Sequence, residues 1–167
     1  MEKQKKNYLH FLSHILLIIF LVGEIASFFI FYNKAGNEII RNIGYGLWIV
    51  SAFLGWLPIL ELRRRGGIPA KQSFVKTTKL VDTGIYSICR HPQFLGGILI
   101  GLSLFLIAQH WVVLIFGILV MIIFYLGVVE GDRSALEKFG QEYQQYKERV
   151  PRLNFVVGII RLLRKKK

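Results

Sequence analysis

Four apolar runs leave this sequence few ways to fold in water. They cover roughly residues 8–32, 43–62, 92–108 and 111–129. A run of about 20 apolar residues matches the hydrocarbon core of a bilayer, and 53% of the chain is hydrophobic. Read as one helix, residues 92–129 would be nearly twice as long as a core of roughly 30 Å, so we predict two helices turning at "QH". We expect an all-α, polytopic membrane protein with four transmembrane helices, the last two forming a hairpin.

The distribution of Lys and Arg predicts how these helices are oriented. Three cations precede the first run, seven lie between the second and third, and ten follow the fourth, whereas the other side holds only Lys34 and Arg41. By the positive-inside rule, both termini are cytoplasmic. The net charge of +12 is therefore read as membrane topology, not as binding to nucleic acid. Membrane lipids are the expected partners, and residues 1–167 form one membrane domain.

After residue 129 the pattern changes to that of an amphipathic cytoplasmic helix. Its apolar stripe recurs at spacings of three and four residues: Leu136, Phe139, Tyr143, Tyr146 and Val150. Pro151 ends this helix, because the residue before a proline is biased away from helical geometry. The closing "FVVGIIRLLRKKK" is too short to cross a bilayer and is read as an interfacial segment.

Two charged groups meet at the cytoplasmic ends of the third and fourth runs. Arg90 and His91 precede the third run, and Glu130 and Asp132 follow the fourth. If the runs form a hairpin, these groups are neighbours and make a candidate site for a polar ligand from the cytosol. The simpler reading is that Arg90 snorkels to lipid headgroups and that Pro92 only starts a helix.

Two motifs then resemble a known family. The string "GIYSICRHPQFLG" fits G-x-Y-x-x-x-R-H-P-x-[YF]-x-G, and "LEKFGQEYQQYKERVP" fits L-x-x-x-F-G-x-x-Y-x-x-Y-x-x-x-V-P with one residue of slack. Together they are similar to the isoprenylcysteine carboxyl methyltransferase and phospholipid methyltransferase superfamily of integral membrane enzymes. The resemblance covers roughly residues 75–152.

This resemblance implies S-adenosylmethionine as cofactor, bound on the cytosolic side by elements 82–97 and 130–152. The residues that it places at the cofactor are Tyr86, Arg90, His91, Pro92, Gln93, Phe94, Gly96, Glu130 and Asp132. It implies a lipophilic methyl acceptor, either a carboxyl of the isoprenylcysteine type or a lipid amine. Methyl transfer from a sulfonium mainly needs positioning and exclusion of water, so no catalytic residue is assigned.

The sequence departs from the family pattern on its acidic side. Members commonly carry a Glu-Glu pair where this chain has Gly131 and Asp132, and an arginine one turn earlier, where Leu126 and Gly127 stand. That arginine contacts a substrate carboxylate, so its absence makes a lipid amine at least as good a candidate acceptor.

Glu24 lies in the middle of the first run. A charge at the bilayer centre costs about 2.5–3.5 kcal/mol, so this side chain is expected to be protonated, paired or facing a cavity. We read Glu24 either as a contact of the acceptor substrate or as a structural hydrogen bond between helices.

Two other functions remain open. A reductase of the sterol-reductase type, using NADPH, shares the Arg-His-Pro motif, but Gly96 and Gly97 occupy the place of its acid and Tyr143 that of its tryptophan. A non-enzymatic scaffold is the third reading, suggested by Gly131. The single cysteine excludes an intramolecular disulfide, and no spacing of Cys or His predicts a metal site.

Overall fold

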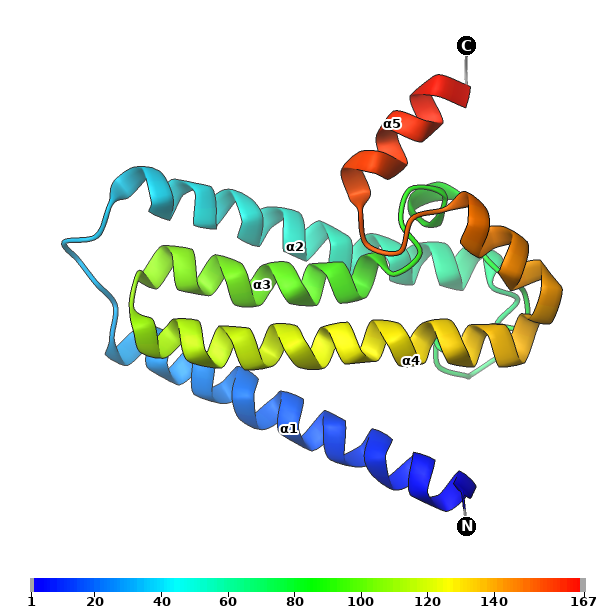
Figure 1. Cartoon of the computed structure of the whole chain (residues 1–167), viewed down its shortest axis with the longest axis horizontal. Coiled ribbons are helices and arrows are strands. Elements are labelled where there is room, and N and C mark those ends of the chain that lie inside the picture. Colours follow the sequence, from blue (N-terminus) through cyan, green and yellow to red (C-terminus); the bar gives the residue numbers. More distant parts are fainter. Residues whose placement is uncertain (1, 166–167) are drawn as a thin grey trace. The chain divides into compact units, whose positions relative to one another are not determined.

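The computed structural model describes residues 2–165, and the regular secondary structure in this part of the chain is all helical, with no strand (Figure 1). The elements are, in order, α1 (Glu2–Ile30), α2 (Glu38–Arg65), the short 3₁₀ helix η1 (Gly84–Ser87), α3 (Pro92–Ala108), α4 (Trp111–Arg149) and α5 (Phe155–Lys165). The all-α prediction is confirmed for these residues, and α3 has the predicted bounds. Proline is its first helical residue, where the missing N–H would have no partner in any case.

In the part of the chain that the structure describes, three helices are long and apolar enough to cross a membrane. They comprise Phe11–Ile30, Glu38–Arg65 and Trp111–Arg149, whereas α3, with 17 residues, is shorter. Large apolar side chains on α1, α2 and the first part of α4 are exposed, as lipid-facing side chains would be. In α4 the apolar stretch ends at Val129, and charged residues begin at Glu130. The helix continues past this point for about five more turns.

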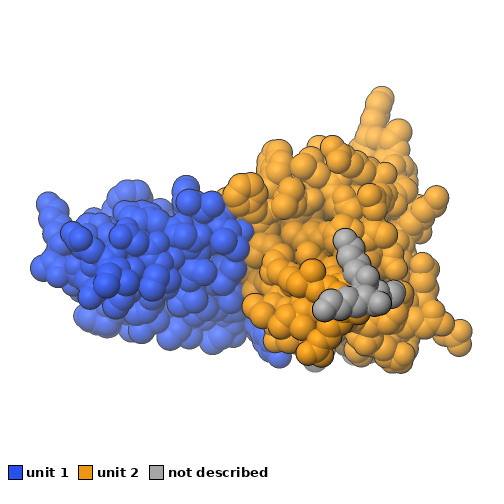
Figure 2. All heavy atoms as spheres, turned by 90° about the horizontal axis from the view of Figure 1, so that it is seen from above, with its two compact units in different colours: residues 1–51, 97–126 blue, residues 52–96, 127–167 orange. Residues whose placement is uncertain are grey.

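The chain divides into two compact units, coloured separately in Figure 2. Unit 1 contains residues 1–51 and 97–126, and unit 2 contains residues 52–96 and 127–167. Each boundary falls inside a helix.

In unit 1, helices α1, α3 and α4 approach each other closely at small residues. A Cβ added to Gly101 would lie 3.1 Å from the main-chain oxygen of Gly117, and one added to Gly117 would lie 2.9 Å from Glu24 Oε1. A Cβ on Gly23 would overlap the ring of Phe116. Glycines at these places let membrane helices pack backbone to backbone.

In unit 2, α4 changes direction at Gly140, which has φ 55° and ψ −126°. A Cβ there would meet nothing within 4 Å, so the glycine is needed for its backbone conformation and not for space. The sequence pattern predicted one uninterrupted amphipathic helix from residue 130, and this is wrong. After the kink, Tyr143, Tyr146 and Val150 are buried together, whereas Leu136, before it, is exposed.

Candidate functional site

Asp132 is the centre of a buried polar cluster in unit 2. Its Oδ1 accepts hydrogen bonds from Arg90 Nη1 at 3.0 Å, from His91 Nε2 at 2.6 Å and from the Tyr143 hydroxyl at 2.5 Å. Its Oδ2 accepts one from Arg152 Nε at 2.8 Å. Arg90 and Asp132 are only 8% and 7% exposed. We call these five residues the Asp132 cluster.

The segment before α3 is positioned by the segment after α4. The main-chain N–H groups of Arg90 and His91 donate to the carbonyls of Pro151 and Arg152 at 3.1 and 3.3 Å. The Cys89 thiol donates to the carbonyl of Arg152 at 3.3 Å. These bonds fix the backbone of residues 89–91 and so limit the positions that the side chains of Arg90 and His91 can take.

Two tyrosines hold the other side of this segment. The hydroxyl of Tyr146 donates to the carbonyl of Tyr86 at 2.7 Å, and its ring lies edge-on against that of Tyr143, with centroids 5.7 Å apart. Both tyrosines reach the cluster because the kink at Gly140 turns the end of α4. Tyr86, Tyr143 and Tyr146 therefore connect η1 to the Asp132 cluster.

The glycines of α4 leave room for the side chains that follow the Arg-His pair. A Cβ on Gly131 would lie 3.1 Å from Cε1 of His91, and one on Gly127 would overlap the ring of Phe94. The rings of His91 and Phe94 pack edge to face at 5.8 Å. The absence of side chains at Gly127 and Gly131 thus makes space for this aromatic pair.

The electrostatics of the cluster favour a carboxylate at Asp132, which lies beyond the apolar part of α4. Burial alone would raise the pKa of Asp132, but the hydrogen bonds from His91 and Tyr143 and the charges of His91 and Arg90 outweigh burial and hold the pKa well below its usual range. Burial and the bond to Asp132 raise the pKa of Tyr143, so its hydroxyl keeps its proton. Burial raises the pKa of the Cys89 thiol to about 11, and the thiol is therefore unreactive at neutral pH.

One polar atom of the cluster is left over. Arg90 Nε is buried and has no hydrogen-bond partner among the described residues. Two guanidinium groups also face one carboxylate, so the cluster keeps a net positive charge. Both features suit a further anionic group close to Arg90.

The residues predicted at the cofactor fall into three groups: those joined to the Asp132 cluster, those at the start of α3, and Glu130 on α4. Tyr86, Arg90, His91, Phe94 and Asp132 are joined by the contacts above. Pro92 and Gly96 are buried at the start of α3, Gln93 is half-buried beside them, and Glu130 is half-buried on α4, where Ser134 Oγ donates to it at 3.4 Å.

Glu24 is a separate case, because it belongs to unit 1. It is fully buried, and neither of its carboxyl oxygens has a partner among the described residues. Across all the described residues, the structure has no group of three or more His, Cys, Asp or Glu side chains arranged to bind a metal.

Sequence reasoning missed the roles of Tyr143, Tyr146 and Arg152. The two tyrosines were predicted as members of an apolar stripe and as positions of the second motif, and their hydrogen bonds in the site were not predicted. The signal that could have found them is the Phe-Gly pair at 139–140, because a glycine in the middle of an amphipathic pattern marks a possible turn of the backbone. Arg152 directly follows Pro151, outside any helix, and nothing in the spacing points to its partner.

Comparison with known proteins gives one match. The model of a family described as "Protein of unknown function (DUF1295)" matches residues 1–150. No curated protein and no solved structure matches the chain. The matched range includes the first motif, the second motif except its final residue Pro151, all of α1 to α4 and four of the five residues of the Asp132 cluster. The chain belongs to the DUF1295 family, a family of unknown function.

Proposed function

We propose that the protein is a membrane methyltransferase that uses S-adenosylmethionine at the cytoplasmic face and transfers the methyl group to a lipophilic acceptor. The observation that carries the proposal is the direct contact between the Arg-His-Pro segment and the acidic end of α4, through Arg90, His91 and Asp132. These are the two segments that the sequence motifs assign to the cofactor.

The proposal includes a topology. We place four crossings in the membrane, with α3 as the short third crossing and α3 and α4 as a hairpin turning at Gln109 and His110. Both termini then lie in the cytoplasm, as the positive-inside rule predicts. In this arrangement Arg90 and Asp132 lie at the inner boundary of the bilayer, where a soluble cofactor and a lipid-borne acceptor can meet.

The residues present fit the cofactor's functional groups. Its carboxylate needs a cationic donor, and Arg90 has a buried Nε that no described residue satisfies. Its adenine needs an aromatic neighbour, which Phe94 offers beside His91. Its amino group and ribose hydroxyls need acceptors. Asp132 already accepts four hydrogen bonds, so Glu130 is the better candidate for this role.

Asp132 therefore has a different role in this proposal from the direct cofactor contact that the resemblance implied. It orients Arg90 and His91 through its hydrogen bonds while they face the cofactor, and it offsets part of the positive charge of the two guanidinium groups. It is a positioning residue in this proposal, and Arg90, His91 and Phe94 are the contacts.

The chemistry requires little more from the chain. Arg90, His91 and Phe94 would hold the cofactor, which when bound would supply an activated methyl group to the acceptor's lone pair, with the electron pair of the broken carbon–sulfur bond left on sulfur. The protein holds the two in line and excludes water. An amine acceptor loses a proton after the transfer. Leu126 and Gly127 stand where a carboxylate-binding arginine would be needed, so we favour a lipid amine over an isoprenylcysteine carboxyl.

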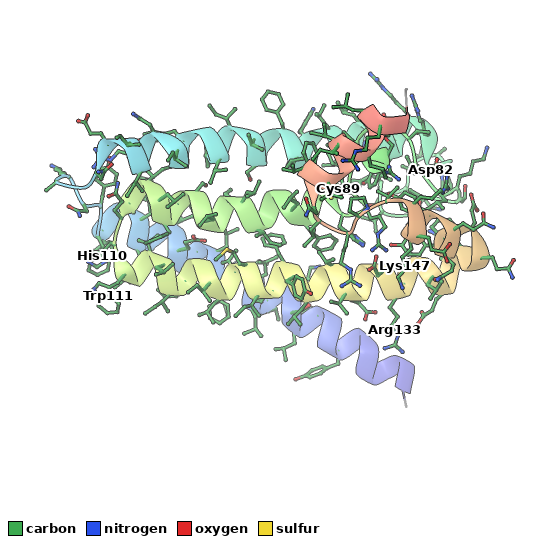
Figure 3. All side chains as sticks on the ribbon, turned by 45° about the horizontal axis from the view of Figure 1, so that its top comes forward. Asp82, Cys89, His110, Trp111, Arg133 and Lys147 are labelled. Carbon is green, nitrogen blue, oxygen red and sulfur yellow. The ribbon has the colours of Figure 1, made fainter. Side chains whose placement is uncertain are left out.

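Calorimetric titration of the full chain in detergent tests the proposal. We expect S-adenosylmethionine to bind and NADPH not to bind. His91→Ala should weaken binding about tenfold or more, and Arg133→Gln is the matched control, because Arg133 is exposed on α4 and points away from the cluster (Figure 3). Binding of NADPH alone would support the reductase instead, and binding of neither would support a scaffold.

A transfer assay then identifies the acceptor class. Radiolabelled S-adenosylmethionine incubated with protein and a total lipid extract should label an amine-containing lipid. Label found only in base-labile methyl esters would show that the acceptor is a carboxyl.

A further inference from the structure

A second polar site lies in unit 2, among η1, the end of α4 and α5. It is a half-open cavity of about 340 Å³. Its lining is formed by Asp82, Thr83, Gly84, Ser87, Tyr146, Arg149, Val150, Arg161 and Leu162. In Figure 3, Asp82 marks its η1 side, next to α5. None of the residues proposed to contact the methyl donor lines it.

Arg161 gives this cavity an uncompensated positive charge. Its two terminal nitrogens donate to the main-chain carbonyls of Arg149 and Ser87, and its Nε is buried with no hydrogen-bond partner among the described residues. Carbonyl oxygens satisfy hydrogen bonds but carry no net charge. A half-buried guanidinium held in this way still favours an anion nearby.

The other charged residues of the cavity leave that positive charge in place. Arg149 lies 3.5 Å from Asp82, so these two exposed side chains largely cancel. The cavity therefore has a net charge of +1 from Arg161, together with the hydroxyl-bearing residues Thr83 and Ser87. Arginines with neighbouring hydroxyl groups are the usual recognition set for phosphate. Small-molecule pockets begin at about 300 Å³, so the cavity has room for a phosphate with a small ester group.

Helix α5, which closes the cavity, presents an apolar stripe to its surroundings. Gly158 packs directly on the main chain of Ile88, and a Cβ there would overlap its carbonyl oxygen. Away from this contact, Val156, Ile160 and Leu163 are exposed by 66%, 45% and 63%. A short helix with such a stripe and several cations is typical of a segment lying in the headgroup region of a membrane.

We propose that this cavity binds the phosphate of a phosphate monoester, with Arg161 as its principal ligand. The source is either the headgroup of an anionic lipid such as phosphatidic acid, which the apolar stripe of α5 favours, or a soluble phosphate ester. The inference is independent of methyl transfer and concerns residues that the proposed function does not use.

Two ligands that differ only in the phosphate test this proposal on the full chain in detergent. We expect dioctanoyl phosphatidic acid to bind in calorimetric titration and dioctanoylglycerol not to bind. Glycerol 3-phosphate tests whether a soluble phosphate ester is the ligand. If it binds as tightly as phosphatidic acid, the site is assigned to soluble esters. If it binds at least tenfold more weakly, the site is assigned to lipid. Equal binding of phosphatidic acid and dioctanoylglycerol would overturn the proposal.

Charge variants locate the site. Arg161→Gln should weaken binding of phosphatidic acid about tenfold or more, whereas Arg164→Gln, which removes the same charge from an exposed position of the same helix, should change it less than twofold. Equal losses in both would show that only the general charge of α5 matters, against the proposal. Asp82→Asn provides a test in the opposite direction, because removing the acid from the lining should tighten binding severalfold. Unchanged or weaker binding in Asp82→Asn would also contradict the assignment.

Discussion

The two acids that are fully or nearly fully buried among the described residues have opposite surroundings. Asp132, in unit 2, accepts hydrogen bonds from four side chains, two of them guanidinium groups. Glu24, in unit 1, has no partner for either carboxyl oxygen among the described residues and lies against Gly117. Burial of a carboxyl group is thus compensated in two different ways. Asp132 stays ionised and organises cations around it, whereas an unpaired Glu24 avoids the cost of a buried charge by carrying its proton.

This difference predicts that the two acids respond very differently to the same chemical change. Replacing each by its amide removes the possibility of a negative charge and keeps the shape of the side chain. The expected losses of stability range from several kcal/mol at the Asp132 cluster to almost nothing at Glu24.

The largest effect is expected for Asp132→Asn. The variant leaves the buried Arg90 without its counter-ion, and breaking such a pair typically costs about 3–5 kcal/mol. Thermal unfolding in detergent at neutral pH should show a clear fall in Tm, with Glu130→Gln as the neighbouring control.

The loss of stability in Asp132→Asn should also depend on pH. Because the folded pKa of Asp132 lies below the unfolded value of about 3.9, its stabilisation is complete above that pH and is lost as the pH falls towards the folded pKa. The difference in Tm from wild type should therefore shrink below about pH 4. A difference that is constant from pH 7 to pH 3 would argue against an ionised Asp132.

The next effect is expected for Tyr143→Phe, which removes one donor to the carboxylate. A hydrogen bond to a charged group contributes about 1.5–3 kcal/mol. Tyr146→Phe is the matched variant, because its hydroxyl donates to a neutral carbonyl, and we expect about 0.5–1.5 kcal/mol there. If denaturation gave the two variants in the reverse order, Asp132 would not be the charged centre of the cluster.

Arg152→Gln should have a smaller effect. Its side chain is 37% exposed, so its attraction to Asp132 is screened by solvent, and we expect a loss of about 1 kcal/mol or less. Raising the salt concentration should reduce the gap between this variant and wild type. Asp132→Asn, which affects the buried Arg90, should be less sensitive to salt.

The smallest effect is expected for Glu24→Gln. The amide removes no hydrogen bond and no charge, so unfolding should change by less than about 0.5 kcal/mol. Glu24→Lys is the contrasting variant, because a lysine is harder to neutralise inside the membrane than a glutamate. This variant should reduce the yield of folded protein in the membrane. A marked loss in Glu24→Gln would show that Glu24 has an essential partner.

Sequence patterns predicted much of this fold because membrane spans follow from simple counts of apolar residues. The all-helical class, the bounds of α3 and the meeting of Arg90 and His91 with Asp132 could all be inferred from runs, spacing and motifs. The kink at Gly140 could not, because a glycine permits a positive φ without requiring it. The roles of Tyr143 and Arg152 depend on that kink and on the chain path after it, so they were also out of reach.

The Asp132 cluster also has an order of assembly. Its members are made in the sequence Arg90 and His91, Asp132, Tyr143 and finally Arg152, and the carbonyls that hold residues 90 and 91 belong to residues 151 and 152. Asp132, the counter-ion of Arg90, is therefore synthesised 42 residues after it. The cluster closes only after residue 152 has left the ribosome, when the preceding helices have already been made. A chain interrupted between residues 132 and 152 would retain the apolar helices and still lack a finished site.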